Sequence, residues 1–197
     1  MMLKSPNKFE EYKALWLRNL RRLDKMINNL VDSQRGDKDM PLVLTLCDPM
    51  DIVSRVIADV EPIARMAGIE IKLRHESLPL GLVDDEAIGR AIENLLTNAI
   101  KFSPRGEKVI VDLGMEMKGE KLNIKITDHG NGIDEEEQKF LFMPFSRGRS
   151  AQKKGVPGTG LGLFVTKKIV ESHGGVLLFQ SELGKGTKVT ISLPWTI

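Results

Sequence analysis

The stretch that decides the fold is Asn94-Leu95-Leu96-Thr97-Asn98-Ala99-Ile100-Lys101-Phe102, the end of a segment with helical periodicity that begins near Asp84. At about 100° per residue, Asn94, Asn98 and Lys101 lie within roughly 60° of one another on one helix face. A different arc carries apolar side chains that can pack on a sheet: Ile88, Ile92, Leu95 and Ala99. Two amide oxygens and an ammonium suit a magnesium ion bound to phosphate. Taken alone, two asparagines on a solvated helix face are more often without function.

Two glycine-rich segments follow this helix. The first, Asp128-His129-Gly130-Asn131-Gly132-Ile133, ends an apolar strand with a carboxylate and then supplies two glycines. The carboxylate can accept from an exocyclic amine such as that of adenine, and the glycines let the backbone approach a flat ligand. An ordinary aspartate-initiated turn has the same pattern. The second, Gly158-Thr159-Gly160-Leu161-Gly162-Leu163, leads into a helix whose free N–H groups could bind a phosphate chain.

Neither of the common nucleotide-binding motifs is present. The second glycine segment lacks the G-x-G-x-x-G spacing, and no predicted strand ends at Gly158. The segment Gly184-Lys185-Gly186-Thr187 is not a Walker A motif, because glycine follows Lys185 and no glycine lies five residues before Gly184. The sequence therefore disfavours both the Rossmann fold and the P-loop fold.

The order of these motifs resembles the catalytic domain of sensor histidine kinases. That family's N, G1, F and G2 boxes are matched, in this order, by residues 94–102, 128–132, 142–145 and 158–162. Three further stretches look like the end of the second dimerisation helix, the end of the last helix and the closing strand: 22–32, 171–175 and 186–194. The resemblance thus covers most of the chain.

The resemblance implies that the chain binds ATP and Mg²⁺. Asn98 is then the main Mg²⁺ ligand, with Asn94 beside it, and Lys101 contacts the phosphates. Asp128 accepts from the adenine amino group, and Thr187 supports it directly or through water. The other nucleotide-binding residues that the motifs imply are Gly130, Gly132, Ile133, Phe142, Phe145, Gly158, Thr159, Gly160, Leu161, Gly162 and Leu163.

A polar stretch over about 134–157 lies between the two glycine segments. A loop that long in a compact domain is usually functional or mobile. In the resembling family it is the ATP lid, in which Phe142 and Phe145 pack the base and Arg147 reaches the γ-phosphate. Arg147, Asn94 and Lys101 are therefore the expected catalytic residues. The other basic residues of the stretch could equally well be solvated side chains of a surface loop: Arg149, Lys153 and Lys154.

The periodicity of the chain predicts an α+β fold. We expect helices that end near Ala67 or span about 84–102 and 161–173, strands over about 69–73, 108–117, 122–128, 176–182 and 187–194, and turns at Pro79 and Gly81. Helices segregated from hairpin-linked strands predict a two-layer sandwich, with helices covering one face of a mixed, largely antiparallel sheet. The catalytic ATP-binding domain should span 37–197.

Residues 1–36 should form a separate unit. Apolar residues recur there at spacings of three and four: Phe9, Tyr12, Trp16, Leu20, Leu23, Ile27 and Leu30. One helix of about 28 residues cannot bury such a seam on itself, so it should pair with another helix, unless it packs on its own domain. The resemblance implies the second helix of a coiled-coil-type dimerisation hairpin, through which the full protein forms a homodimer.

Composition limits the function classes. The chain has 197 residues, 29 of them basic and 27 acidic, so its net charge of +2 gives no global field that would favour nucleic acid or an anionic membrane. The single Cys47 cannot form an internal disulfide, and neither a signal segment nor a run of 18 apolar residues is visible. We expect a soluble, cytoplasmic chain, whose parent protein would reach a membrane only through upstream segments.

The three histidines are His75, His129 and His173, and none lies in the N-terminal helix. We therefore expect each to be a surface or structural residue. The resembling family transfers the γ-phosphoryl group of ATP to a histidine on the first dimerisation helix, and then to an aspartate of a response-regulator receiver domain. The resemblance implies such a protein histidine kinase of a two-component phosphorelay, with an acceptor histidine outside this chain and no self-phosphorylation by the chain alone.

Two other functions compete with this one. In gyrase-type ATPases and the related serine kinases, a glutamate four residues before the magnesium-binding asparagine is the general base. Here that position is Asn94, and Glu93 is turned away by about 100°. The second competitor is a non-catalytic module that uses nucleotide, or nothing, as a conformational signal. The intact glycines and both asparagines argue against it.

Overall fold

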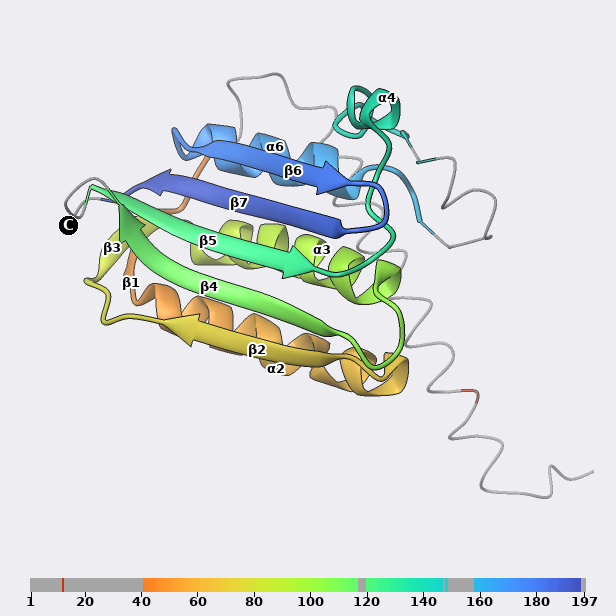
Figure 1. The fold of residues 1–197 in the computed structure, drawn as a ribbon. Coiled ribbons are helices and arrows are strands. Elements are labelled where there is room, and N and C mark those ends of the chain that lie inside the picture. The colour runs from red at the N-terminus through yellow and green to blue at the C-terminus, as the bar shows by residue number, and fades with distance from the viewer. Residues whose placement is uncertain (1–11, 13–40, 117–119, 147, 149–157, 196–197) are drawn as a thin grey trace, which may run out of the picture.

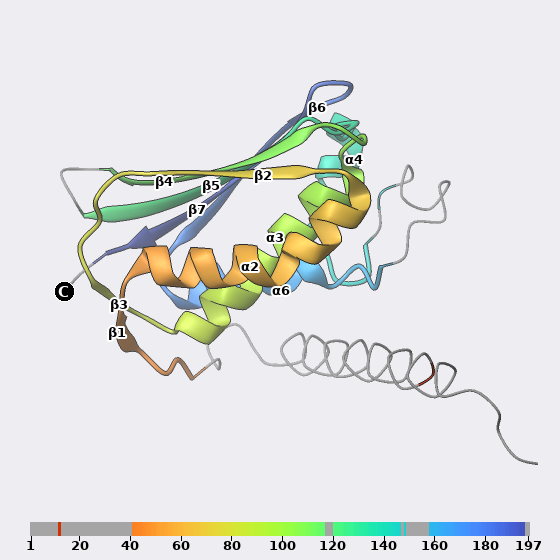
Figure 2. The ribbon, with the colours of Figure 1, turned by 90° about the horizontal axis from the view of Figure 1, so that it is seen from below.

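The computed structural model of the chain describes residues 12, 41–116, 120–146, 148 and 158–195. These residues form two layers, with a sheet on one side and helices against a single face of it (Figure 1, Figure 2). The predicted α+β sandwich is confirmed. Apart from Tyr12, which is helical, the unit expected over 1–36 lies outside the described residues.

The elements follow the chain in an order close to the predicted one. The helices are α2 (Pro49–Ala67), α3 (Asp85–Phe102), α4 (Glu135–Gln138) and α6 (Gly162–Ser172). The strands are β1 (Thr45–Cys47), β2 (Glu70–His75), β3 (Gly81–Val83), β4 (Lys108–Glu116), β5 (Lys121–Asp128), β6 (Val176–Glu182) and β7 (Gly186–Pro194).

The main sheet has the order β2-β4-β5-β7-β6. Strands β2 and β4 are parallel, because β3 and α3 lie between them in the chain and carry it back to the starting edge. The other neighbouring pairs are antiparallel. The register places Asp128 opposite Thr187, and Thr187 opposite Ser181, so these three residues form one row at the end of the sheet.

The core lies between the sheet and the helices. Along each central strand alternate residues are buried, for example Val109 and Val111 on β4 and Ile124 and Ile126 on β5, as the two-residue period of a half-buried strand requires. The helices contribute their apolar arcs to the same cluster: Val53, Val60, Ile88, Ile92, Leu96 and Ile169 are among the fully buried side chains. The arc of α3 predicted to pack on the sheet is therefore confirmed.

The small β1–β3 sheet was not predicted. Gly81, expected in a turn, instead begins β3, which pairs with β1 in antiparallel register. Strands of three residues are too short to produce a recognisable alternation. Glycine is required at position 81 because a Cβ there would overlap the indole of Trp195, whose Nε1 donates to the Pro79 carbonyl over 3.0 Å.

Helix α3 is fixed at its first turn. The Asp84 carboxylate caps it by accepting from the Ala87 amide over 2.9 Å, and it also accepts from the Val43 amide over 3.1 Å. The Asp84 amide in turn donates to His173 Nε2 over 3.1 Å, which ties the end of α6 to the start of α3. Within the described residues, no helix has the length and apolar character needed to cross a bilayer.

Candidate functional site

Helix α3 presents the predicted polar face. Asn94 is only 6% exposed, Asn98 is half-buried, and Lys101 is exposed, with Nζ 5.3 Å from the centre of the Phe102 ring. A buried asparagine on a helix whose other arc faces the core needs polar partners. Two glycines of the second glycine segment lie close to this face, Gly158 and Gly162.

Two close approaches bring that segment against α3. A Cβ placed on Gly162 would lie 3.6 Å from Asn94 Oδ1, and one on Gly158 would lie 3.3 Å from Lys101 Nζ. Helix α6 begins at Gly162 without a side-chain cap, so its first N–H groups remain directed into this region. The asparagine face, the lysine and a helix N-terminus therefore meet at one place.

The segment holds its shape through its middle glycine. Gly160 has a φ of 75°, and a Cβ there would come within 2.6 Å of the Phe145 and Ser146 backbone. The Leu161 amide donates to Thr159 Oγ1 over 3.3 Å, and Leu161 is buried. Leu163, on the first turn of α6, packs against the core.

The aspartate turn, residues 128–133, borders the site at the C-terminal end of α3, where Phe102 follows Lys101. Asp128 Oδ1 accepts from the Gly130 amide over 2.8 Å and from the Thr187 amide over 3.2 Å. Burial raises the pKa of the Asp128 carboxyl, and the two backbone hydrogen bonds lower it in part. A Cβ on Gly130 would lie 2.6 Å from the Phe102 carbonyl oxygen, so the turn packs directly on the end of α3.

Backbone contacts join the aspartate turn to the β6–β7 hairpin. Gly132 has a φ of 63°, and a Cβ on it would overlap the Glu182 carbonyl. The Gly184 amide donates to the Asn131 carbonyl over 2.8 Å. The Ile133 amide donates to Ser181 Oγ over 2.9 Å. The turn is therefore held on both sides, by α3 and by the hairpin.

The beginning of the expected lid packs on β6. Gln138 Nε2 donates to the Ile133 carbonyl over 2.8 Å and to the Ser181 carbonyl over 3.0 Å. The Phe142 ring meets Phe179 of β6 edge-on, with centroids 5.7 Å apart. Phe142 therefore packs as expected.

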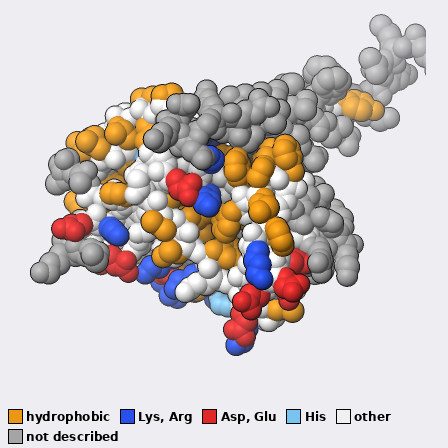
Figure 3. Space-filling model, turned by 90° about the horizontal axis from the view of Figure 1, so that it is seen from above, with side chains coloured by type: hydrophobic (Ala, Val, Ile, Leu, Met, Phe, Trp, Pro, Cys, Tyr) orange, Lys and Arg blue, Asp and Glu red, His pale blue; other side chains and the backbone are white. Residues whose placement is uncertain are grey.

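Phe145 does not pack as expected. Its side chain is 64% exposed, and its φ is 62°, a left-handed value that is uncommon outside glycine. Figure 3 shows apolar side chains on the surface around α6, β6 and α4, and Phe140 and Met143 are also exposed. The contribution of Phe145 is its backbone, which touches Gly160. Arg147 lies outside the described residues.

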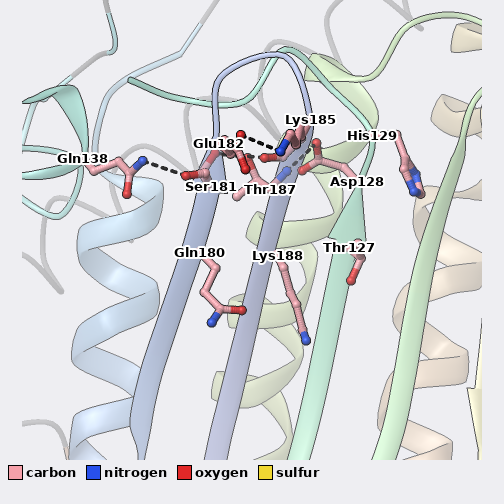
Figure 4. Close-up of a pocket in the computed structure, with 11 residues that line it drawn as sticks. Thr127, Asp128, His129, Gln138, Gln180, Ser181, Glu182, Lys185, Thr187 and Lys188 are labelled. Carbon is pink, nitrogen blue, oxygen red and sulfur yellow. Dashed lines mark hydrogen bonds and ion pairs between the residues drawn. The ribbon is translucent and has the colours of Figure 1, made fainter. Parts of the chain in front are cut away.

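An open depression of about 420 Å³ lies at the ends of β5, β7 and β6 (Figure 4). Asp128 and Thr187 line this depression, and so do Thr127, Lys188 and Gln180, which pair with one another across the three strands. These last three residues alternate with buried residues along their strands, so their side chains face away from the helices. The contacts of Asn94 and Lys101 lie on the opposite, helix-facing side. We therefore place the candidate site between α3, the aspartate turn and the second glycine segment.

The family model described as "Histidine kinase-, DNA gyrase B-, and HSP90-like ATPase" matches residues 83–197. This range contains all of the motifs that meet at the site. The chain belongs to this family. Its kinase branch is indicated by the relatives, since the mycobacterial sensor histidine kinase MprB is 32% identical, with a TM-score of 0.66, over 78% of this chain and 98% of the MprB chain.

Other relatives extend the kinase assignment. The sensor-like histidine kinase SenX3 of Mycobacterium tuberculosis is 34% identical over 175 residues, which are 88% of this chain and 42% of SenX3. The chain thus spans less than half the length of this relative. The fold of full-length ShkA, solved with AMPPNP, matches all of this chain and 40% of ShkA with a TM-score of 0.80 at 23% identity. The region that matches this chain is therefore less than half of SenX3 and of ShkA.

Two residues of the kinase domain that touch the site were not predicted, Ser181 and Gln138. Ser181 lies on β6 on the same face as Leu177 and Phe179, which pack against the core. A polar residue at the end of an apolar strand face was the signal that could have identified it. Gln138 gave no comparable signal, because its role depends on the turn that follows Ile133.

The three histidines of the kinase domain have local roles. His75 and His129 are exposed, and their Nδ1 atoms lie 3.2 Å from the carbonyls of Glu76 and Lys108. His173 Nδ1 lies 2.7 Å from the Ile169 carbonyl, and its Nε2 accepts from the Asp84 amide. None of them lies on the asparagine face of α3.

The donor set limits which metal the kinase domain could hold. Across the described residues, no group of three or more histidine, cysteine, aspartate or glutamate side chains comes close enough to bind a metal ion. Asn94 instead offers an amide oxygen beside Gly162, whose missing Cβ leaves room for phosphate, and Asn98 lies one turn further along the same helix. This arrangement fits a hard cation that is held jointly by protein oxygens and a phosphate chain.

Proposed function

We propose that the domain binds Mg-ATP and transfers its γ-phosphoryl group to a histidine of a dimerisation helix supplied from elsewhere in the full protein. The acceptor would then pass the phosphoryl group to an aspartate of a response-regulator receiver domain. One observation carries the proposal. Asn94 and Lys101 of α3 face Gly162 and Gly158, while the end of the same helix supports the turn that holds Asp128.

The aspartate turn and the second glycine segment both lie against the C-terminal half of α3, between Asn94 and Phe102. The adenine end of the site is near Gly130 and Asp128, where a half-buried carboxylate oriented by two backbone amides can accept from an amine. The phosphate end of the site is near Gly158 and Gly162, where N–H groups of α6 and the Lys101 ammonium offset negative charge. A single ligand can therefore contact both groups of residues.

Phosphoryl transfer needs positioning more than covalent chemistry from the protein. The bond between the γ-phosphorus and the bridging oxygen of ADP breaks, a bond to the imidazole nitrogen forms, and the imidazole proton passes to solvent. Asn98, with Asn94, would hold Mg²⁺ through amide oxygens, and the ion when bound neutralises charge on the phosphates. Lys101 would orient the phosphates, and Arg147 would contact the γ-phosphate.

Asn94 favours transfer to an acceptor over hydrolysis. An amide cannot take a proton from water at neutral pH, whereas a carboxylate at this place on α3 could. Asn94 lies against Gly162, the first residue of α6, and supplies no such base there. The domain should therefore hydrolyse ATP slowly and should need the acceptor helix for turnover.

The function is tested by incubating the domain with γ-labelled ATP and a separately expressed dimerisation hairpin that bears the acceptor histidine. We expect acid-labile, base-stable phosphate on the hairpin, and none when that histidine is replaced by glutamine. A hairpin that assembles with the ATP-bound domain and remains unlabelled would count against the kinase assignment. Homodimerisation through the N-terminal segment would be measured in the same samples by light scattering.

A further inference from the structure

One hydroxyl group lies at the centre of the contacts between β6, β7 and the aspartate turn. Ser181 Oγ is 2.9 Å from the Ile133 amide nitrogen, 3.0 Å from the Gly186 carbonyl oxygen and 2.9 Å from Thr187 Oγ1. Figure 4 shows Ser181 and Thr187 side by side on β6 and β7. Both hydroxyl side chains are half-buried and belong to the row Asp128, Thr187, Ser181. The row forms the adenine end of the site proposed above.

These contacts fix the direction of each hydrogen bond. The Ile133 amide can only donate, and the Gly186 carbonyl can only accept. The single proton of Ser181 must therefore go to Gly186 if that contact is to be a hydrogen bond. The contact with Thr187 is then satisfied only if Thr187 donates its own proton to Ser181. The opposite direction would leave the Ser181 and Gly186 oxygens facing each other without a proton at 3.0 Å.

Thr187 is consequently left with lone pairs alone for a ligand. Beside it, Asp128 is also an acceptor, and the Gly130 and Thr187 amides already bond to its Oδ1. An amine with two hydrogens matches two neighbouring acceptors, either directly or with a water molecule between them. A carbonyl oxygen in the same place would meet lone pairs and would leave these half-buried acceptors unpaired.

We propose that Ser181 is a positioning residue that sets base specificity by holding the Thr187 hydroxyl as an acceptor. The ligand class it selects is a 6-aminopurine nucleotide over a 6-oxopurine nucleotide. Ser181 does not touch the base itself; it acts through Thr187. The inference rests on the proposed function, because it assumes that the base lies against Asp128.

Neighbouring contacts keep Ser181 in this role. Gln138 donates to both the Ile133 and Ser181 carbonyls, which holds the Ile133 amide in line with Ser181 Oγ. Glycine is required at position 186, because its φ is 105° and a Cβ would overlap the Asp128 carbonyl. The acceptor of the Ser181 proton is therefore fixed by the backbone.

The experiment compares binding of AMPPNP and GMPPNP, with magnesium, to the full chain and to four variants by calorimetry. Ser181→Ala frees the Thr187 hydroxyl to rotate and donate, so the preference for AMPPNP should fall by about tenfold, the effect of roughly one hydrogen bond. Ser181→Thr keeps the hydroxyl on a strand that tolerates a β-branched residue, and it should retain the parent preference within about twofold. Thr187→Val should lower the preference to a similar extent as Ser181→Ala.

The double variant Ser181→Ala/Thr187→Val separates specificity from simple support of the fold. If Ser181 acts through Thr187, removing it in the Thr187→Val background should leave the nucleotide preference unchanged. An unchanged preference in Ser181→Ala alone, or equal weakening of both nucleotides, would overturn the inference while leaving the proposed function intact. A parent chain that binds neither nucleotide would overturn the proposed function and this inference with it.

Discussion

Replacing Asp128 with asparagine should abolish tight nucleotide binding without unfolding the domain. Oδ1 of Asp128 accepts from the Gly130 and Thr187 amides, and an asparagine oxygen can take over both bonds. The amide nitrogen must then occupy the position of Oδ2. A donor would face the adenine amine, which is itself a donor.

The loss of affinity follows from these contacts. A hydrogen bond to a charged group contributes about 1.5–3 kcal/mol, and an unsatisfied donor adds a further penalty. We expect a total of about 2–4 kcal/mol, which corresponds to roughly 30- to 900-fold weaker binding. Calorimetry with AMPPNP and magnesium at pH 7.5 measures it directly. Asp112→Asn makes the same chemical change on the outer face of β4 and should bind like the parent.

Although Asp128→Asn weakens nucleotide binding, it should not lower the free energy of unfolding at neutral pH. Burial raises the pKa of Asp128 above its ordinary value, so the folded protein holds this proton more tightly than the unfolded chain. The contribution of the Asp128 carboxyl group to stability is therefore present at acid pH, and it is lost as the pH rises through the pKa of the folded protein. At neutral pH the asparagine variant should be at least as stable to urea as the parent. Parent-like binding of AMPPNP by this variant would refute the adenine assignment, and a destabilised variant would refute the reasoning about the buried charge.

Three further substitutions, two of them paired with a control variant, test the structure. Thr166 is fully buried and its hydroxyl has no hydrogen-bond partner among the described residues, so Thr166→Val should raise the free energy of unfolding by about 1 kcal/mol in urea titrations, and a loss of stability would contradict this. Gly132→Ala should cost about 2 kcal/mol or more, because of its left-handed backbone and the Glu182 carbonyl. Gly184→Ala, with open space around it, is the control and should cost only about 1–2 kcal/mol; equal losses would show that the overlap is relieved. Asp84→Ala removes the α3 cap and should cost about 1–2 kcal/mol in thermal unfolding, more than Asp134→Ala at the short α4.

The sequence predicted the long elements well because each carries its own periodic signal. Helix α3 has a capping aspartate, an apolar arc and a polar arc, and the paired strands β4 and β5 alternate over eight or nine residues. Strands β1 and β3 have three residues each, and their pairing depends on contacts between distant parts of the chain. Tertiary contacts of this kind leave no local pattern.

The sequence predicted the positions of some residues of the candidate site but not of others. Asn94, Lys101 and Asp128 could be placed because helical spacing and a strand end determine where their side chains lie. The exposure of Phe145 could not be predicted, since the residue has a left-handed backbone angle and its backbone lies against Gly160, a contact between distant parts of the chain. The role of Ser181 could not be predicted either, because it requires the register between β6 and β7.

The central claim is that nucleotide binds on the helix-facing side of the sheet, between α3 and the two glycine segments. The most direct measurement is a nitrogen–proton NMR titration of the chain with AMPPNP and magnesium. We predict the largest amide shifts at Asn98, Gly130, Gly132, Gly160 and Gly162, with small shifts at Lys188 and Gln180 on the outer face. Shifts that centre on Lys188 and Gln180, with the α3 and glycine amides unchanged, would place the ligand in the open depression on the face of the sheet away from the helices, and they would contradict the account.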